Sequence, residues 1–187
     1  MSESEIFMKG KLLLDGGDLC GSVFHHTVVL ICDHSAEGAF GLVLNRVAGK
    51  KVGEVLVADL SDALRESPMF FGGPVQPTAL SYLHSDSFLP DANVLPNLNV
   101  GHSLDDLVDI GESLSPVKKI KLFAGYAGWS PGQLEKEMKR KSWLTFPASL
   151  EFVFDTPPEQ LWQAVMKSKG GWKNKLLSQM PENLSWN

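Results

Sequence analysis

One stretch constrains the fold of this chain more than any other, the segment Ile120-Lys-Leu-Phe-Ala-Gly-Tyr-Ala-Gly-Trp-Ser-Pro-Gly-Gln-Leu-Glu135. Its first five residues form an apolar run beside lysines, which predicts a buried or half-buried strand. A turn rich in glycine and aromatic residues follows. Ser130 then fits the N-cap of a helix, with Pro131 at the first helical position and Gln133 completing a capping box. The pattern therefore predicts a strand, an aromatic turn and a helix start that exposes backbone N–H groups.

Length and composition fit one cytoplasmic domain over residues 1–187. A chain of 187 residues with 43% hydrophobic content can bury one sizeable core. No run approaches the roughly 18 apolar residues of a membrane span. The acidic start, Met1-Ser-Glu-Ser-Glu-Ile6, lacks the pattern of a signal peptide. Cys20 and Cys32 are too few for a disulfide framework, so we expect a cytoplasmic protein without a membrane partner.

The formal net charge of −5 is spread unevenly along the chain. Residues 1–117 carry 6 basic and 16 acidic side chains, giving −10, and residues 118–187 carry 11 and 6, giving +5. A basic half can bind nucleic acid or acidic substrates. The simpler interpretation is that the two halves complement each other within one fold or across a dimer. Because there is no helix-turn-helix signature and no aromatic-studded basic stripe, we expect no direct DNA binding.

The rest of the chain reads as a mixture of strands and helices. We predict strands at residues 11–14, 26–32, 39–44, 79–84, 120–124 and 150–155, a strand that runs into a sharp turn at 69–74, and a long loop with a short strand at 86–99. We predict helices at 103–110, after Ser130, at 157–169 and at 172–179. Residues 52–65 have helical spacing and predict one helix or two short ones. The strands around the turn at 33–38 should form a hairpin, in which Gly41 marks a bulge or a close backbone approach. This mixture indicates an α+β domain with a mixed, strongly twisted sheet.

The histidines and cysteines offer one alternative function. His25 and His26 are adjacent on a predicted strand, so they should point to opposite faces. Cys32 and His34 flank Asp33 and could act together only if the fold brings them together in space. No spacing matches a structural zinc site or a His-Glu-x-x-His helix, so we expect no metal or cofactor, and Cys32 is read as a small core residue. The alternative is a hydrolase or transferase that uses a histidine near Asp33 and His34.

The glycine-rich segments match no phosphate-binding motif. Neither Gly125-x-x-Gly128-x-x-x-Gly132 nor Gly72-Gly73-Pro74 fits the dinucleotide fingerprint or the P-loop. Tight turns with positive φ explain these glycines more simply. Tyr126 and Trp129 can either stack on a flat ligand or seal the edge of a core.

Three blocks carry a family resemblance: Glu37-Gly-Ala-Phe-Gly-Leu-Val-Leu-Asn-Arg46, Phe71-Gly-Gly-Pro-Val75 and Tyr126-Ala-Gly-Trp-Ser-Pro-Gly-Gln-Leu-Glu135. They are similar to the YqgE/AlgH family of small bacterial proteins, and the resemblance covers nearly the whole chain. It implies one α+β domain whose sheet is bent into a partial barrel with flanking helices. Members are described as transcriptional regulators, and the family supplies no catalytic residues. The chain departs from the family at Asp15-Gly-Gly17, where an alanine-x-proline segment is usual, and at Gly21, where an aspartate is usual.

Together these features favour a cytoplasmic, non-enzymatic binding or regulatory protein. The candidate ligand-binding surface consists of Asn45, Arg46, Gly72, Gly73, Tyr126, Trp129 and Gln133. Arg46 would contact an anion, and the two aromatic residues would stack on the ligand. The competing interpretation is that these residues stabilise turns, and it is the stronger one for Gln133 and the glycines. The expected partner is a small anion or another protein.

Overall fold

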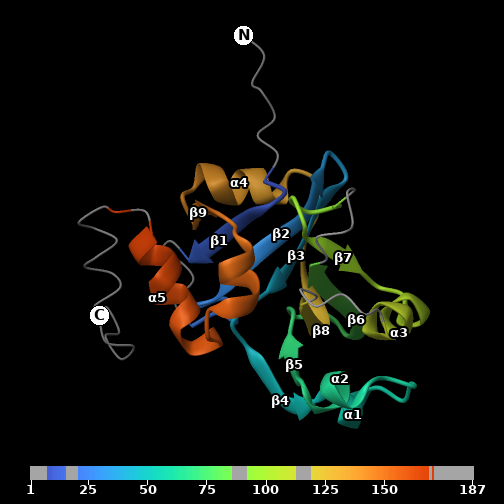
Figure 1. The fold of residues 1–187 in the computed structure, drawn as a ribbon. Helices are drawn as coiled ribbons and strands as arrows, with labels where there is room; N and C mark the ends of the chain where they lie inside the picture. Colours follow the sequence, from blue (N-terminus) through green and yellow to red (C-terminus); the bar gives the residue numbers. More distant parts are fainter. Residues whose placement is uncertain (1–7, 16–20, 86–91, 113–118, 169, 171–187) are drawn as a thin grey trace.

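The structure, a computed structural model, describes residues 8–15, 21–85, 92–112, 119–168 and 170. Nine strands form one mixed sheet with helices packed on both faces (Figure 1). The strands are β1 (Lys11–Asp15), β2 (Val28–Ser35), β3 (Gly38–Val43), β4 (Val47–Lys51), β5 (Pro68–Phe71), β6 (Val75–Ser85), β7 (Asn99–Gly101), β8 (Lys119–Trp129) and β9 (Trp143–Pro147). The helices are α1 (Val52–Val55), α2 (Asp62–Glu66), α3 (Leu104–Glu112), α4 (Gln133–Lys139) and α5 (Pro158–Ser168), with a π-helical turn, η1, at Glu151–Asp155. The predicted α+β class is confirmed.

The strand β8, which contains the apolar run at residues 120–124, pairs with three other strands of the sheet. Its first half pairs in parallel with β5, and its second half pairs antiparallel with β3. A third strand, β6, runs antiparallel along β8, with a register shift opposite Gly125, whose φ is +70°. The strand order is β4-β5-β8-β3-β2-β1-β9, with β6 and β7 added beside β8. This sheet is mixed, as predicted, but it does not close into a barrel.

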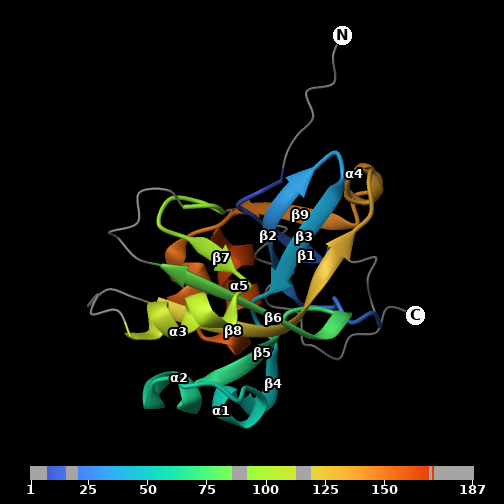
Figure 2. The ribbon, with the colours of Figure 1, turned by 90° about the vertical axis from the view of Figure 1, so that its right-hand side faces the viewer.

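Apolar clusters cover the two faces of the sheet. Phe123 of β8 belongs to the largest cluster, which lies between the sheet, η1 and α5. The neighbouring Leu122 belongs to a cluster on the other face, beneath α1, α2 and α3. Beyond Gly125, Trp129 belongs to a third cluster, beneath α4. In both views α4 lies at one end of the molecule and α1 and α2 at the opposite end (Figures 1 and 2).

Residues 150–155 form a π-helical turn, so the strand predicted there is wrong. The N–H of Val153 donates to the carbonyl of Ser149 at 3.1 Å, and the N–H of Thr156 donates to that of Glu151 at 2.9 Å. Apolar residues at 150, 153 and 154 have helical spacing, and the same sequence also shows alternation. Short apolar runs are ambiguous in this way. Here all three positions pack against the cluster around Phe123, which favours the helical turn.

The helices α4 and α5 both begin later than predicted. The helix α4 begins at Gln133, with Gly132 as N-cap at φ +70°, rather than at Pro131. The Ser130 N–H still donates to Gln133 Oε1 at 3.0 Å, so half of the predicted box is present. The helix α5 begins at Pro158, and the Thr156 hydroxyl donates back to the carbonyl of Glu151 at 3.1 Å instead of capping the helix.

Several predicted elements are confirmed and two strands were missed. The strands β2 and β3 form the expected hairpin, and residues 52–65 contain two short helices. A Cβ on Gly41 would lie 2.8 Å from the Leu30 carbonyl oxygen, and β2 bulges between Ile31 and Asp33. The missed strands are β4, exposed at every residue, and β9, an edge strand with two buried aromatics. The helix predicted at 172–179 lies outside the described residues.

Candidate functional site

The first of three groups of predicted site residues holds the turn that precedes β2. Asn45 Oδ1 accepts a hydrogen bond from the Val28 N–H at 2.8 Å, and Asn45 Nδ2 donates to the His26 carbonyl at 2.9 Å. Arg46 Nη2 donates to the His25 carbonyl at 2.7 Å. Both side chains therefore fix the backbone at the start of β2, and the Arg46 guanidinium remains exposed.

The second group lies where β5 ends beside β8. A Cβ on Gly72 would lie 2.2 Å from the Gly125 carbonyl oxygen, and one on Gly73 would lie 2.2 Å from the Tyr126 carbonyl carbon. These two positions require glycine because backbone packs directly on backbone. Tyr126 itself is half-buried, and its ring centroid lies 5.1 Å from that of Phe40.

The third group belongs to the packing of α4. Trp129 is only 6% exposed, and its indole Nε1 donates to Glu137 Oε2 at 2.8 Å. Trp143 Nε1 donates to the same oxygen at 2.8 Å, and Gln133 Nε2 donates to Glu137 Oε1 at 3.0 Å. One carboxylate thus accepts three hydrogen bonds from side chains that join β8, β9 and α4. This arrangement gives Trp129 a structural role. That the seven residues of the candidate ligand-binding surface bind one ligand together stays a prediction.

His25 and His26 are not on a strand, so the prediction that they point to opposite faces is wrong. They lie in the turn before β2, where His26 has a φ of +54°. Their rings stack with centroids 4.1 Å apart, and His26 also packs on Trp162 at 4.4 Å. His25 Nδ1 lies 3.4 Å from Asp15 Oδ2. The strand predicted at residues 26–32 therefore begins only at Val28, after the two histidines.

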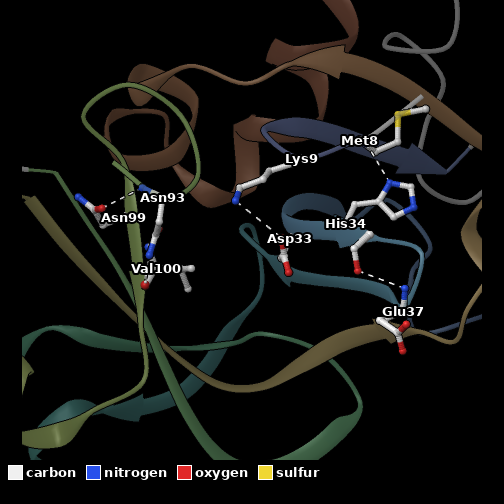
Figure 3. Close-up of polar contacts among 9 residues, drawn as sticks. Met8, Lys9, Asp33, His34, Glu37, Asn93, Asn99 and Val100 are labelled. Atoms are coloured by element: carbon white, nitrogen blue, oxygen red, sulfur yellow. Dashed lines mark hydrogen bonds and ion pairs between the residues drawn. The ribbon is translucent and has the colours of Figure 1, made fainter. Parts of the chain in front are cut away.

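Cys32 and His34, which could act together only if the fold joined them, lie apart. The bulge in β2 places Cys32 in the cluster beneath α5, whereas His34 faces α4. His34 Nδ1 accepts from the Met8 N–H at 3.0 Å, as Figure 3 shows, and its Nε2 lies 2.9 Å from Glu135 Oε1. Burial raises the pKa of the Cys32 thiol, which disfavours the nucleophilic thiolate. Asp33 is exposed and pairs with Lys9 at 3.7 Å (Figure 3).

A pocket of about 250 Å³ opens between β5, β8 and the segment from η1 to α5. Six of its ten lining residues are apolar, and the polar side chains are one lysine, one aspartate and two hydroxyls. The lining residues are Ser67, Pro68, Phe70, Ile120, Lys121, Phe154, Asp155, Thr156, Pro157 and Pro158. Both hydroxyls already donate to backbone carbonyls, Ser67 to Leu64 at 2.7 Å and Thr156 to Glu151 at 3.1 Å.

Lys121 is the buried cation of this pocket, with 9% of its surface exposed. Its Nζ donates to the carbonyl oxygens of Leu44 at 2.9 Å and Val153 at 3.1 Å. The same nitrogen lies 4.1 Å from the centroid of the Phe70 ring. Desolvation lowers the pKa of Lys121 to about 8, because burial disfavours the charged form. No carboxylate in the described part of the chain forms an ion pair with it.

Asp155, the carboxylate that lines the pocket, forms an ion pair with Lys119 and not with Lys121. Both carboxylate oxygens of Asp155 accept hydrogen bonds from Lys119 Nζ, at 2.5 and 2.7 Å. Lys119 and Asp155 are each close to half exposed, so this pair lies at the surface and Lys121 lies deeper. The pocket therefore contains one buried positive charge without a carboxylate partner among the residues described.

The sequence contains a signal for Lys121 that the motifs considered above do not include. Lys121 and Phe123 are two residues apart on a strand, so their side chains share a face. Phe123 is fully buried, which makes the face of Lys121 the core face. The pocket could not be predicted from the sequence, because residues 150–155 are predicted as a strand, whereas they form the helical turn that lines the pocket.

Comparisons with known proteins agree with the resemblance in the sequence. A family model described as AlgH-like matches residues 12–174. A UPF0301 protein of Chlamydia abortus is 38% identical over 185 residues, covering 97% of this chain and 96% of the relative. One of Chlorobaculum tepidum is 38% identical over 173 residues, covering 91% of each.

Two solved structures are similar to this fold. The solution structure of the AlgH protein from Pseudomonas aeruginosa has a TM-score of 0.74 at 31% identity, covering 97% of this chain and 98% of that one. A crystal structure of a Corynebacterium diphtheriae protein has a TM-score of 0.75 at 24% identity, covering 96% and 95%. The second comparison speaks for the fold alone.

Proposed function

We propose that this chain, which belongs to the AlgH-like family, is a binding protein for a small organic anion. The proposed site is the pocket above Lys121. One observation carries the proposal: Lys121 lines a pocket, and its buried ammonium has no carboxylate partner in the described residues. A buried charge is costly unless it is paired, and an anion in the pocket would supply the missing charge.

The walls of the pocket favour an anion with an apolar body. Phe70, Phe154 and three prolines offer no hydrogen-bond donors from their side chains, and the two hydroxyls are already engaged. Phosphate and sulfate need several donors, whereas a carboxylate can be held by one ammonium and apolar packing. The volume lies below the roughly 300–1,000 Å³ of pockets for drug-sized ligands, so the ligand is small. A regulatory role would follow if this ligand changes how the protein meets a partner.

Calorimetric titration with benzoate tests the proposal, with benzamide as the uncharged analogue. We expect benzoate to bind the wild-type protein and benzamide to bind at least tenfold more weakly, because only benzoate carries the negative charge. Lys121→Met should lose benzoate binding. Lys136→Met removes the same charge from an exposed position on α4 and should leave binding unchanged. Equal binding of benzoate to both variants would refute the site.

The same titration predicts a pH dependence. Only the protonated Lys121 pairs with an anion, and burial lowers the pKa of that ammonium to about 8. Affinity should therefore be constant below pH 7 and fall about tenfold per pH unit well above pH 8, as the protonated fraction falls. An affinity that is unchanged between pH 7 and pH 9.5 would show that another group holds the anion.

A further inference from the structure

We propose that Lys121 forms a reversible imine with a small 2-oxo acid that enters the pocket. This inference rests on the proposed function for its pocket and adds a covalent step to it. The carboxylate of such a compound would pair with the positive charge, and the adjacent keto carbon would lie within reach of the same nitrogen. The proposed ligand is then a 2-oxo acid, which is a narrower chemical class than organic anions in general.

The hydrogen bonds of Lys121 fit a nucleophilic amine. The carbonyl oxygens of Leu44 and Val153 can accept a hydrogen bond from an ammonium or from a neutral amine. In the neutral form the two N–H groups would donate to these carbonyls, and the lone pair would take the remaining direction. Within the described part of the chain no hydrogen bond occupies that direction. Phe70, which lies beside the nitrogen, also lines the pocket.

The surroundings of the nitrogen favour the reaction. Lysines activated by desolvation in apolar pockets are the usual nucleophiles of imine chemistry. Because burial lowers the pKa of Lys121 to about 8, a much larger fraction of this amine is neutral at pH 7.5 than for an exposed lysine.

The step is balanced without any further reactant. The nitrogen lone pair attacks the keto carbon, a C–N bond forms, and the keto oxygen leaves as one water molecule. Counted from the ammonium, two of its three hydrogens leave with that oxygen and the third remains on the iminium nitrogen. The positive charge is conserved next to the carboxylate of the ligand. Addition of water reverses the reaction.

Reductive trapping of the full-length protein tests this inference. The protein is incubated at pH 7.5 with glyoxylate, the smallest 2-oxo acid, and cyanoborohydride, and labelled lysines are identified by peptide mass mapping. We expect Lys121 to be labelled at least tenfold faster than Lys119 and Lys136, which are exposed. Faster labelling of the exposed lysines would overturn the inference. The wild-type map decides this without any variant.

A competition arm separates this inference from the proposed function. Excess benzoate should slow the labelling of Lys121 at least tenfold, and Lys121→Arg, which keeps the charge, should remove the label. If benzoate binds but Lys121 resists labelling, the imine is refuted and anion binding stands. If Lys121 is labelled but benzoate neither binds nor protects it, anion binding is refuted and the reactive amine stands.

Discussion

At the scale of single residues, Lys121 makes the stability of the fold depend on pH. Its pKa is lowered to about 8 in the folded protein from 10.5, so the unfolded chain binds more protons between these values. Stability therefore rises with pH across this window, by about 2 kcal/mol between pH 7 and pH 9.5. Below pH 8 the full cost of burying the ammonium is present.

Urea unfolding of the wild type and Lys121→Met at pH 7 and pH 9.5 measures this contribution. Titratable groups that the two proteins share contribute equally to both free energies of unfolding, so their contributions cancel in the difference. We expect the wild type to gain relative to the variant at the higher pH, because the variant has no ammonium to discharge. A difference in free energy that is the same at both pH values would mean that Lys121 is not desolvated.

Trp129 separates a structural from a ligand-binding interpretation. Its side chain is 6% exposed and packs beneath α4, with its indole N–H on Glu137. Truncating a buried aromatic side chain costs roughly 3–5 kcal/mol, so Trp129→Ala should lose stability of that order. Denaturant melts decide the question. A loss below about 1 kcal/mol, the usual range for surface positions, would return Trp129 to the candidate ligand-binding residues.

At the scale of elements, the start of α4 gives a sharper test than the sequence alone allowed. The structure contains the bond from the Ser130 N–H to Gln133 Oε1, and Gly132 occupies the N-cap. Gln133→Ala should therefore cost about 1 kcal/mol, as the loss of a typical hydrogen bond does. Ser130→Ala should cost only a few tenths. Thermal melts that reverse this order would show that the Ser130 hydroxyl caps the helix.

The elements also show how far sequence patterns reach. The first half of β8 and the hairpin of β2 and β3 could be predicted from their strong apolar runs. The turn predicted at residues 125–129 is wrong, because β8 continues through its glycines to Trp129. The turn η1 could not, because its apolar spacing fits a strand and a helical turn equally well. The strand β4 has no buried residue, so it carries no alternation to detect.

At the scale of the whole molecule, the net charge determines how strongly the protein can bind nucleic acid. A chain with a formal charge of −5 should repel the phosphate backbone, which supplies nearly all non-specific affinity. We expect no submicromolar binding of labelled duplex DNA at about 100 mM salt, where such binding is normally visible. Tight binding that weakens steeply with added salt would contradict this expectation and favour a direct role in transcription.

The candidate site depends on the assembled molecule, which limits what its sequence could predict. The pocket combines β5, β8 and η1, and the cation at its base bonds to carbonyls from residues 44 and 153. No local pattern indicates that these segments meet. The sequence motif identified Gly72 and Gly73 as candidate site residues. In the structure both lie against the backbone of β8, which gives them a structural role. A motif alone cannot distinguish this role from ligand binding.

An NMR titration of the Lys121 side chain, with selectively labelled lysine, tests directly whether this ammonium holds an anion. In the free protein its pKa should be about 8. Saturating benzoate should raise that pKa by at least one unit, because a bound anion favours the charged form. The resonances of Lys136 should not respond. If the Lys121 pKa is unchanged by benzoate, or lies near 10.5 in the free protein, Lys121 is not the partner of an anion.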